Sequence, residues 1–398
     1  MDVRIFADTI DDKAKEQVYA LAEQPAFRDC KIRIMPDVHA GAGCVIGFTA
    51  NLGDKVIPNV VGVDIGCGML VASLGKKDID LDGLDRFIRE KIPSGLSVNS
   101  EVQGFVYPLD HLRCNDQLRN KEWLIKSLGT LGGGNHFIEI DTDENGEKYL
   151  VIHTGSRNLG KQVADYYQDV AVKNCKDGKI ATMNRERDRI IAEYKASGRK
   201  NEISGALKVL KESTRSTASI PDALCYLEGD AAKDYLHDMG ICQHFATWNR
   251  LLILSRIAAE FGLPDAHCEF ETVHNYIDLE SGIVRKGAVR ALLGERLIIP
   301  MNMRDGCIIG VGKGNEEWNC SAPHGAGRIM SRAEARKSLD LNRYRESMNG
   351  IFTTSVSDGT IDEAPMAYKP AKEIIGLIEP TVKIEKIIRP IYNFKAAE

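Results

Sequence analysis

The sequence predicts an α+β fold in a single domain spanning residues 1–398, with packed, mainly antiparallel β-sheets surrounded by helices. Expected strands and helices alternate without a regular βαβ rhythm, which argues against a doubly wound parallel sheet. Residues 270–312 are rich in strand-forming segments, and Gly282, Gly287 and Gly294 fall where hairpin turns would. We find no internal repeat and no low-complexity linker.

Composition limits the class of protein. The 398 residues are 43% hydrophobic and 27% charged, as is typical of a soluble globular protein. No run of about 18 apolar residues is present, so we expect no membrane span. The N-terminal segment is acidic and does not resemble a signal peptide. Ten irregularly spaced cysteines without a Cys-x-x-Cys pair predict a reduced, cytoplasmic protein. A net charge of −5 excludes bulk nucleic-acid binding, so any such contact would need a local basic patch.

In the first half of the chain we expect helices to alternate with strands. Residues 11–24 fit an amphipathic helix, because their apolar residues recur on one side. The polar segment 199–222 is expected to be partly a surface loop. The other expected elements are an edge strand at 2–8, strand–turn–strand over 31–50, and helices at 82–92, 116–127, 160–174 and 182–198.

In the second half the longest helical pattern is 229–261, which we interpret as a core helix. It carries His237 and His244, which lie too far apart for one ion and are interpreted as structural or surface residues. The remaining elements are strands at 270–280, 283–291, 296–300, 306–312 and 381–395, and a helix at 331–338.

The most informative stretch is 59–70, where an apolar run of strand type ends in a turn with three glycines. Such a turn lets the backbone approach a ligand closely. It carries Asp64 and Cys67. The carboxylate is a hard oxygen donor, and a nearby metal would deprotonate the thiol. Asp-x-x-Cys alone is a weak pattern, because turn aspartates and buried cysteines are common.

Three histidines strengthen the case for metal binding. His136 follows a glycine cluster, His153 precedes Thr-Gly-Ser-Arg, and His274 stands beside Asn275. A lone histidine near a strand is usually structural, and we assign His39 to that class. Three imidazoles, one thiolate and one carboxylate together suit zinc or manganese. Five ligands exceed one tetrahedral site, so two adjacent ions that share a bridging group would use them all.

A further histidine, His324, lies in Pro-His-Gly-Ala-Gly-Arg, where the glycines free the backbone around it. Arg328 follows, at what we expect to be the start of a helix, and a helix N-terminus attracts phosphate. A neutral imidazole is a good nucleophile toward phosphorus when the leaving pyrophosphate is neutralised.

With these segments in view, the sequence resembles the RtcB family of RNA ligases, from Met35-Pro-Asp-Val-His-Ala-Gly41 to Lys395. The resemblance implies an RtcB-like fold. It also implies a GTP- and manganese-dependent enzyme that joins RNA 3′-phosphate or 2′,3′-cyclic phosphate ends to 5′-hydroxyl ends, in tRNA splicing or RNA repair. Two Mn²⁺ ions would be held by Asp64, Cys67, His136, His153 and His274. Ligand chemistry alone favours zinc, because thiolate is soft for manganese.

The resemblance also assigns roles within the reaction. His324 would take GMP covalently, and Asp37 would orient its ring, although an aspartate after proline is more often a turn former. The residues implied for GTP or GMP are Asn135, His136, Phe137, Ile138, Glu139, His274, Asn275, Pro300, Met301, Asn302, Met303, His324, Gly325, Ala326, Gly327, Tyr368 and Lys395. Candidates for the RNA backbone are Arg157, Arg328 and Arg332, because guanidinium groups bind phosphate oxygens in pairs.

Within the pocket, Glu139 offers an acceptor for guanine and Lys395 a donor, unless Lys395 belongs to a frayed tail. One segment departs from the family: the usual Pro-Gly-Ser-Met and a later Ser are replaced, with Asn302 and Cys307 standing where hydroxyls are expected. The alternatives are a metal-dependent phosphoesterase and a non-catalytic protein that binds RNA ends. The sequence identifies neither the physiological RNA nor an activating protein partner.

Overall fold

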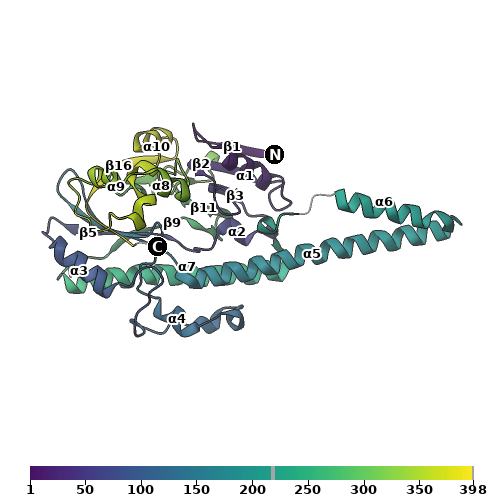
Figure 1. Cartoon of the computed structure of the whole chain (residues 1–398), viewed down its shortest axis with the longest axis horizontal. Helices are drawn as coiled ribbons and strands as arrows, with labels where there is room; N and C mark the ends of the chain where they lie inside the picture. Colours follow the sequence, from purple (N-terminus) through teal and green to yellow (C-terminus); the bar gives the residue numbers. More distant parts are fainter. Residues whose placement is uncertain (217–219, 397–398) are drawn as a thin grey trace.

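A computed structural model of the chain describes residues 1–216 and 220–396, and it confirms the α+β class (Figure 1). Its main sheets have five and seven strands. The helices are α1 (Asp12–Ala22), α2 (Pro58–Val61), α3 (Leu81–Lys91), α4 (Lys121–Lys126), α5 (Arg157–Ala196), α6 (Ile203–Ser216), α7 (Gly229–Glu260), α8 (Arg332–Ser338), α9 (Leu341–Ser347) and α10 (Ala371–Leu377). The strands are β1 (Asp2–Ile5), β2 (Lys31–His39), β3 (Ile46–Asn51), β4 (Lys55–Val56), β5 (Gly68–Gly75), β6 (Phe137–Thr142), β7 (Lys148–Thr154), β8 (Leu227–Glu228), β9 (Cys268–Val273), β10 (Asn275–Asp278), β11 (Ile283–Lys286), β12 (Ala288–Arg290), β13 (Arg296–Asn302), β14 (Gly306–Gly312), β15 (Ser321–Pro323) and β16 (Val382–Lys395).

The seven-stranded sheet runs β13-β14-β16-β6-β7-β5-β9, and every neighbouring pair is antiparallel. It curls until its two edge strands meet, since the Ile298 backbone N–H on β13 donates to Thr272 Oγ1 on β9 at 3.2 Å. Side chains therefore face either the inside of the curl or the helices outside. Ile138 and Ile140 of β6 pack outward with apolar residues of α3 and α7, while Phe137 packs inward.

The five-stranded sheet runs β1-β2-β3-β11-β10, with β1 parallel to β2 and the other pairs antiparallel. The predicted edge strand is confirmed, but it ends at Ile5. The predicted helix at 11–24 is α1, and it buries the expected residues against this sheet: Ala14, Val18, Leu21 and Ala22. The Asp11 side chain accepts a hydrogen bond from the Ala14 backbone and so caps the helix.

The two sheets are joined by a single residue. β9 ends at Val273 in the seven-stranded sheet and β10 begins at Asn275 in the five-stranded one, so His274 lies where the chain passes between them. The Gly66 N–H donates to the Asn275 carbonyl at 2.8 Å, which holds the turn before β5 against this junction. The junction is therefore where loops from both sheets converge.

Two predicted helices are in fact one. Residues 160–174 and 182–198 both lie in α5, a continuous helix of 40 residues. Gly178 lies in the gap between the two predicted segments. One glycine costs a helix only about 1 kcal/mol relative to alanine, which the rest of so long a helix can absorb.

The loop expected over 199–222 is wrong for most of its length, because α6 occupies Ile203–Ser216. Ile203, Ala206, Leu207 and Leu210 recur at the i, i+3, i+4, i+7 spacing of an amphipathic helix and are half-buried. The polar composition of the segment obscured that spacing. Residues 217–219 of the expected loop lie outside the described ranges.

Smaller boundaries also differ. The helix expected at 116–127 is reduced to α4, preceded by a short 3₁₀ turn. The helix expected from residue 331 begins at Arg332, where the Ser331 and Glu334 side chains form a capping box. Arg328 therefore precedes this helix by four residues instead of starting it. Helix α7 and the strands β13, β14 and β16 lie where they were expected. The strands expected at 270–280 and 283–291 are each divided between two sheets, the first at His274 and the second at Gly287.

All ten cysteines lie within the described ranges, and each is free. Within those ranges, no helix has both the length and the apolar character needed to cross a bilayer.

The first prediction concerns two glycines with positive φ. Gly306 (φ 81°) lies against β16, and an added Cβ would lie 2.0 Å from the Ile388 carbonyl oxygen. Gly282 (φ 64°) turns in open space. Gly282→Ala should cost about 1–2 kcal/mol for the left-handed backbone alone. Gly306→Ala should cost at least about twice as much, because backbone atoms must also move. Equal urea midpoints for the two variants would contradict this account of the β13–β14 hairpin.

Candidate functional site

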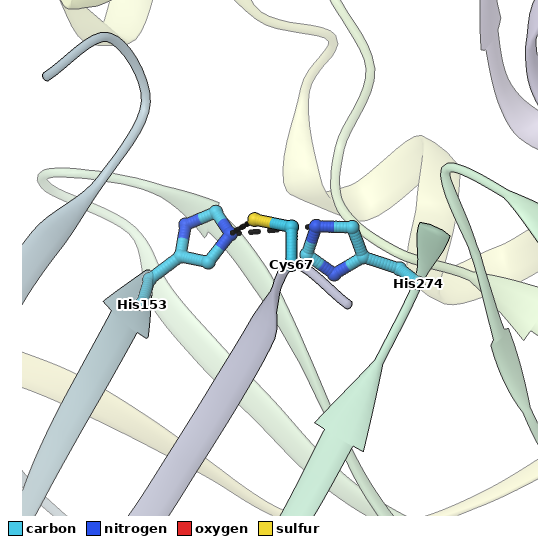
Figure 2. Close-up of side chains that lie close together, drawn as sticks. All are labelled: Cys67, His153 and His274. Atoms are coloured by element: carbon cyan, nitrogen blue, oxygen red, sulfur yellow. Dashed lines mark hydrogen bonds between the residues drawn. The ribbon is translucent and has the colours of Figure 1, made fainter. Parts of the chain in front are cut away.

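Three side chains from neighbouring strands of the curled sheet point toward one another (Figure 2). Cys67 precedes β5, His153 lies near the end of β7, and His274 follows β9. Because these strands are adjacent and end at the same level, their ends form one rim of the curl. All three side chains are buried, so the site is largely shielded from bulk water.

All five predicted metal ligands meet at this rim, in two groups that share one residue. Cys67, His153 and His274 form one group, and Asp64, Cys67 and His136 form the other, each with ligand atoms within 4.8 Å of one another. The Cys67 sulfur lies 3.3 Å from His153 Nε2 and 3.5 Å from His136 Nε2. His136 Nε2 also lies 2.9 Å from Asp64 Oδ2. Cys67 is thus placed to bridge two ions.

The surroundings of the imidazoles select the nitrogen that is free to bind a cation. His136 Nδ1 lies 2.9 Å from the Leu131 carbonyl oxygen, and His153 Nδ1 lies 3.1 Å from that of Asn135. A carbonyl only accepts, so each of these Nδ1 atoms carries a proton, and the His153 Nε2 presents a lone pair. The His136 Nε2 faces the Asp64 carboxylate instead. His153 Nε2 lies 3.4 Å from His274 Nε2. Nitrogen, sulfur and oxygen ligand atoms thus converge, as a metal site requires.

Burial reinforces this interpretation. It lowers the pKa of His153 and of His274 well below the usual range, so both rings are neutral. Burial, together with the Asp64 carboxylate, raises the pKa of the Cys67 thiol well above its usual range. A thiol in this setting ionises when a cation lies beside it. The residues present therefore fit a divalent metal of the zinc or manganese class.

A glycine makes room for the carboxylate ligand. A Cβ on Gly155 would lie 2.1 Å from Asp64 Oδ1, so only glycine lets the loop after β7 pass so close. Arg157, the first residue of α5, lies beyond it with a φ of 57°. Its guanidinium donates to Thr130 Oγ1 at 3.1 Å and to the Gly95 carbonyl at 3.0 Å. These contacts give Arg157 a structural role and do not favour the predicted one at the RNA backbone.

His324 and Asp37, predicted as nucleophile and orienting carboxylate, are paired. His324 Nδ1 lies 2.6 Å from Asp37 Oδ2, and the His324 backbone N–H donates to the same oxygen at 3.1 Å. Asp37 is fully buried at the end of β2, so its side chain cannot drift into solvent. The ring of His324 lies against His274, with centroids 4.9 Å apart. The pair therefore adjoins the candidate metal centre.

His39, which was interpreted as structural, lies on the other side of Asp37. Its Nδ1 lies 2.9 Å from the Asp37 carbonyl oxygen, and burial lowers its pKa to about 4. His237 and His244, also interpreted as structural or surface residues, lie on α7 away from this site.

A cavity of about 1090 Å³ opens beside His324. Most of the residues predicted for the nucleotide line it: Asn135, Phe137, Glu139, Pro300, Met301, Asn302, Met303, His324, Gly325, Ala326, Gly327, Tyr368 and Lys395. Four others do not reach its wall: His136, Ile138, His274 and Asn275. His136 and His274 belong to the candidate metal centre, and Ile138 points outward into the core against α7. The cavity is large enough for a nucleotide.

The partners of the two charged cavity residues differ from the simplest expectation. Lys395 is not a frayed tail, because its backbone closes β16 and its ammonium donates to Glu363. Glu139 accepts a hydrogen bond from the Asn393 amide instead. Burial opposes ionisation of Glu363, but Lys395, Arg332 and Arg328 outweigh it and lower its pKa to about 2. Sequence reasoning missed Glu363, because no local pattern marks it.

The two remaining arginine candidates are attached to the same acidic segment, a 3₁₀ helix at Asp358–Glu363. Arg328 Nη1 donates to Glu363 Oε1 and to the Tyr368 hydroxyl, both at 3.2 Å. Arg332 Nη1 lies 2.6 Å from Asp362 Oδ2 and from Glu363 Oε1. Both arginines line the cavity, and part of their charge is already neutralised.

Inside the curled sheet, a second acidic group lies below the cavity. Glu139, Asp141 and Cys307 are all buried, with ligand atoms within 4.8 Å of one another. Both Asp141 oxygens lack a hydrogen-bond partner among the described residues. Burial raises the pKa of Asp141 well above its usual range, and that of Glu139 to about 7. At least one of these carboxyl groups is therefore protonated at neutral pH.

The sequence is similar to those of known proteins over most of its length. The sequence matches the family described as "tRNA-splicing ligase RtcB" over residues 17–115 and 103–396. It is 28% identical to the RNA-splicing ligase RtcB of Escherichia coli K12, with 97% of this chain and 95% of the relative covered. It is 27% identical to the tRNA-splicing ligase RtcB of Aeropyrum pernix, with 86% of this chain and 82% of that relative covered. It is 25% identical to that of Archaeoglobus fulgidus, covering 94% and 89%.

The second prediction uses the raised pKa of Glu139, which burial shifts from 4.5 to about 7. A raised folded-state pKa contributes stability that is complete below pH 4.5 and is lost as pH rises through 7. Glu139→Gln keeps the acceptor for Asn393 but cannot ionise. The free energy of unfolding of the variant, relative to that of the parent protein, should therefore rise by on the order of 3 kcal/mol between pH 5 and pH 9.

Urea denaturation at several pH values measures this difference. Glu144→Gln, at an exposed position in the turn after β6, is the matched control and should follow the parent protein. If Glu139→Gln and the parent protein lose stability in parallel between pH 5 and pH 7, the Glu139 pKa is not raised in the folded state as inferred.

Proposed function

This chain belongs to the RtcB family, described as tRNA-splicing ligases, and on that premise we propose that it is a GTP- and Mn²⁺-dependent RNA ligase. It joins RNA 3′-phosphate or 2′,3′-cyclic phosphate ends to 5′-hydroxyl ends through a GMP-histidine intermediate, in tRNA splicing or RNA repair. The observation that carries this proposal is the 2.6 Å contact between Asp37 and His324 at the wall of a nucleotide-sized cavity. The ten free cysteines, one of them a proposed ligand, suit a reducing compartment such as the cytoplasm.

In the first step, His324 Nε2 attacks the α-phosphorus of GTP. A nitrogen–phosphorus bond forms, the bond from the α-phosphorus to the bridging oxygen breaks, and pyrophosphate leaves with the electron pair. Asp37 accepts the Nδ1 proton in a hydrogen bond, so Nε2 keeps its lone pair for the attack. The carboxylate also stabilises the positive charge that develops on the ring.

In the later steps the activated group moves to the RNA. An oxygen of the RNA 3′-phosphate attacks the GMP phosphorus, and the nitrogen–phosphorus bond breaks to return His324. The 5′-hydroxyl then attacks the RNA phosphorus, loses its proton and expels GMP. A cyclic phosphate would first be opened by water at the same site. Arg328 and Arg332, which line the cavity, are the residues we propose to contact RNA phosphates.

The five clustered ligands would hold the two divalent ions, with Cys67 common to both groups. Bound there, the ions would neutralise phosphate oxygens and the departing pyrophosphate. Because the ring of His324 contacts that of His274, the proposed nucleophile would lie next to them. The family favours manganese, whereas the thiolate favours zinc, so we propose Mn²⁺ on the family premise.

For the base, we propose that Glu139 accepts from the N1–H and N2 groups of guanine. The Lys395 ammonium donates a hydrogen bond to Glu363, so it is held in place for a guanine oxygen. The Asn302 side-chain amide donates a hydrogen bond to Asp305. Asn302 also lines the cavity, and it lies in the segment that departs from the family. Cys307 lies buried behind Glu139, where it supports the pocket wall without reaching the cavity.

Two other functions compete with this one. A metal-dependent phosphoesterase would use the same ligands without a covalent step, and a non-catalytic protein that binds RNA ends would need the ligands only for affinity. Neither explains why a buried carboxylate orients a histidine outside the metal groups. Turnover of a broken tRNA stem-loop separates the ligase from both.

The third prediction concerns metal content. Because Cys67 belongs to both groups, Cys67→Ala should lose both ions, whereas His136→Ala should lose chiefly one. Cys114→Ala removes a buried thiol elsewhere in the core and should keep both. Elemental analysis after dialysis against Mn²⁺ measures the stoichiometry. Full metal content in Cys67→Ala would remove this residue from the ligand set.

The fourth prediction tests the nucleophile. His324→Ala should lose the covalent GMP adduct and joining from 3′-phosphate ends, yet keep its metal, because His324 lies outside both ligand groups. It should still seal RNA whose 3′ end already carries GMP. Asp37→Asn should slow adduct formation by about a hundredfold or more, since it loses the orienting carboxylate.

Intact mass after incubation with GTP and Mn²⁺ measures the adduct. His39→Ala is the matched control, because it also removes a cavity-lining imidazole but should keep labelling. An acid-labile GMP adduct on His324→Ala would identify another residue as the nucleophile.

A further inference from the structure

A helical hairpin extends from the body of the protein (Figure 1). It consists of the outer part of α5 and most of α6, residues 173–211, and is called the arm below. Helices α5 and α6 contact each other, and Ile190, Ile191 and Leu207 on these helices are half-buried. The arm is therefore a packed antiparallel pair and not a lone helix in solvent.

The helix that carries the arm starts beside the candidate metal centre. Helix α5 begins at Arg157, four residues after His153, and runs without a break for 40 residues. At 1.5 Å per residue this is a rod of about 60 Å. The basic residues near its end lie roughly 40–60 Å along the rod from the ligand His153.

The charge of the arm is opposite to that of the rest of the chain. Residues 173–211 contain eleven lysines and arginines and five acidic residues, a net charge of +6. The whole chain carries −5, so the remaining residues carry −11. All eleven basic side chains of the arm are exposed. The local basic patch that an acidic nucleic-acid enzyme needs is thus concentrated here.

Part of this charge is neutralised within the arm, and part is not. Arginines pair with nearby acids, as Arg189 does with Glu186 and Arg199 with Glu202. Five lysines form no ion pair with any described residue: Lys173, Lys195, Lys200, Lys208 and Lys211. Compact ammonium groups on solvated helices suit contact with phosphates. Such contacts depend on charge and do not distinguish one nucleotide sequence from another.

We propose that the arm binds the sugar-phosphate backbone of the RNA duplex next to the break, so that the broken end lies at the metal centre. This inference rests on the proposed ligase function. The arm has one aromatic residue, Tyr194, which is half-buried under Arg199. Without exposed aromatic platforms the arm lacks what single strands stack on, so a duplex is the better fit. A duplex turn is about 35 Å in DNA, so the arm reaches one to two turns from the break.

The test neutralises the unpaired lysines of the arm: K195Q/K200Q/K208Q/K211Q. The control K76Q/K91Q/K372Q/K383Q removes the same charge from exposed lysines of the body. Both variants bind, at several salt concentrations, a stem-loop broken in the loop with a stem of two duplex turns. For the arm variant, the plot of log affinity against log salt should become shallower by about 2–4, since each phosphate contact contributes close to one unit. Affinity near 0.1 M salt should fall at least about tenfold, and the control should change little.

Two further measurements separate this inference from the proposed function. Labelling with GTP needs no RNA, and joining of short single strands does not reach the arm, so both should be unchanged in the arm variant. A parent protein that never labels, while the arm variant still binds the stem more weakly, would refute the ligase and leave the RNA-binding arm standing.

Several results would overturn the arm proposal. Equal salt dependence and equal affinity for arm variant and control would mean that the stem does not contact the arm. Loss of GTP labelling in the arm variant would mean that these lysines are needed for the reaction with GTP and not only for binding RNA. An unchanged RNA affinity together with lost binding to an acidic protein would make the arm a protein interface.

Discussion

The shared contact of the Cys67 sulfur with His136 and His153 is the constraint on which the rest of the structure depends. These side chains come from segments up to 86 positions apart, and they meet only if β5, β6 and β7 pair in the observed register. Two glycines serve the same convergence: Gly155 lets a loop pass close to Asp64, and Gly66 lets the turn before Cys67 pass close to α7 while its N–H bonds to the Asn275 carbonyl. Burial keeps the imidazoles of His153 and His274 neutral, and it raises the pKa of the Cys67 thiol, which would ionise beside a cation.

Much of this could be predicted from the sequence. The α+β class, most strands and the buried face of α1 follow from periodicity and turn residues, which act locally. The convergence of five ligands and the Asp37–His324 pair were expected from the family resemblance, since sequence spacing alone cannot report which strand ends are neighbours. Helix α6 was missed even though its apolar residues have helical spacing, because its polar composition dominated the interpretation.

What could not be predicted depends on strand register over long separations. Asn393 faces Glu139 because β16 pairs with β6, and Lys395 meets Glu363 because β16 ends beside a 3₁₀ turn. The same pairing places Glu139 and Asp141 inside the curled sheet near Cys307. Two carboxyl groups in an apolar interior carry a free-energy cost that no packing contact there offsets. Natural proteins accept such a cost chiefly where function requires it, and Glu139 lines the cavity.

Helix α5 begins just after His153, so the geometry of the candidate metal centre and the reach of the arm are set by opposite ends of one helix. The first turn of the helix lies beside Asp64, while its far end packs against α6 and the 3₁₀ turn at Lys200–Glu202. Adding one heptad to each helix would move the tip outward by about 10 Å without changing a contact at the ligands. In the proposed complex with RNA, the length of the arm could therefore change independently of the residues at the candidate metal centre, so insertions alone could adapt related chains to substrates of different size.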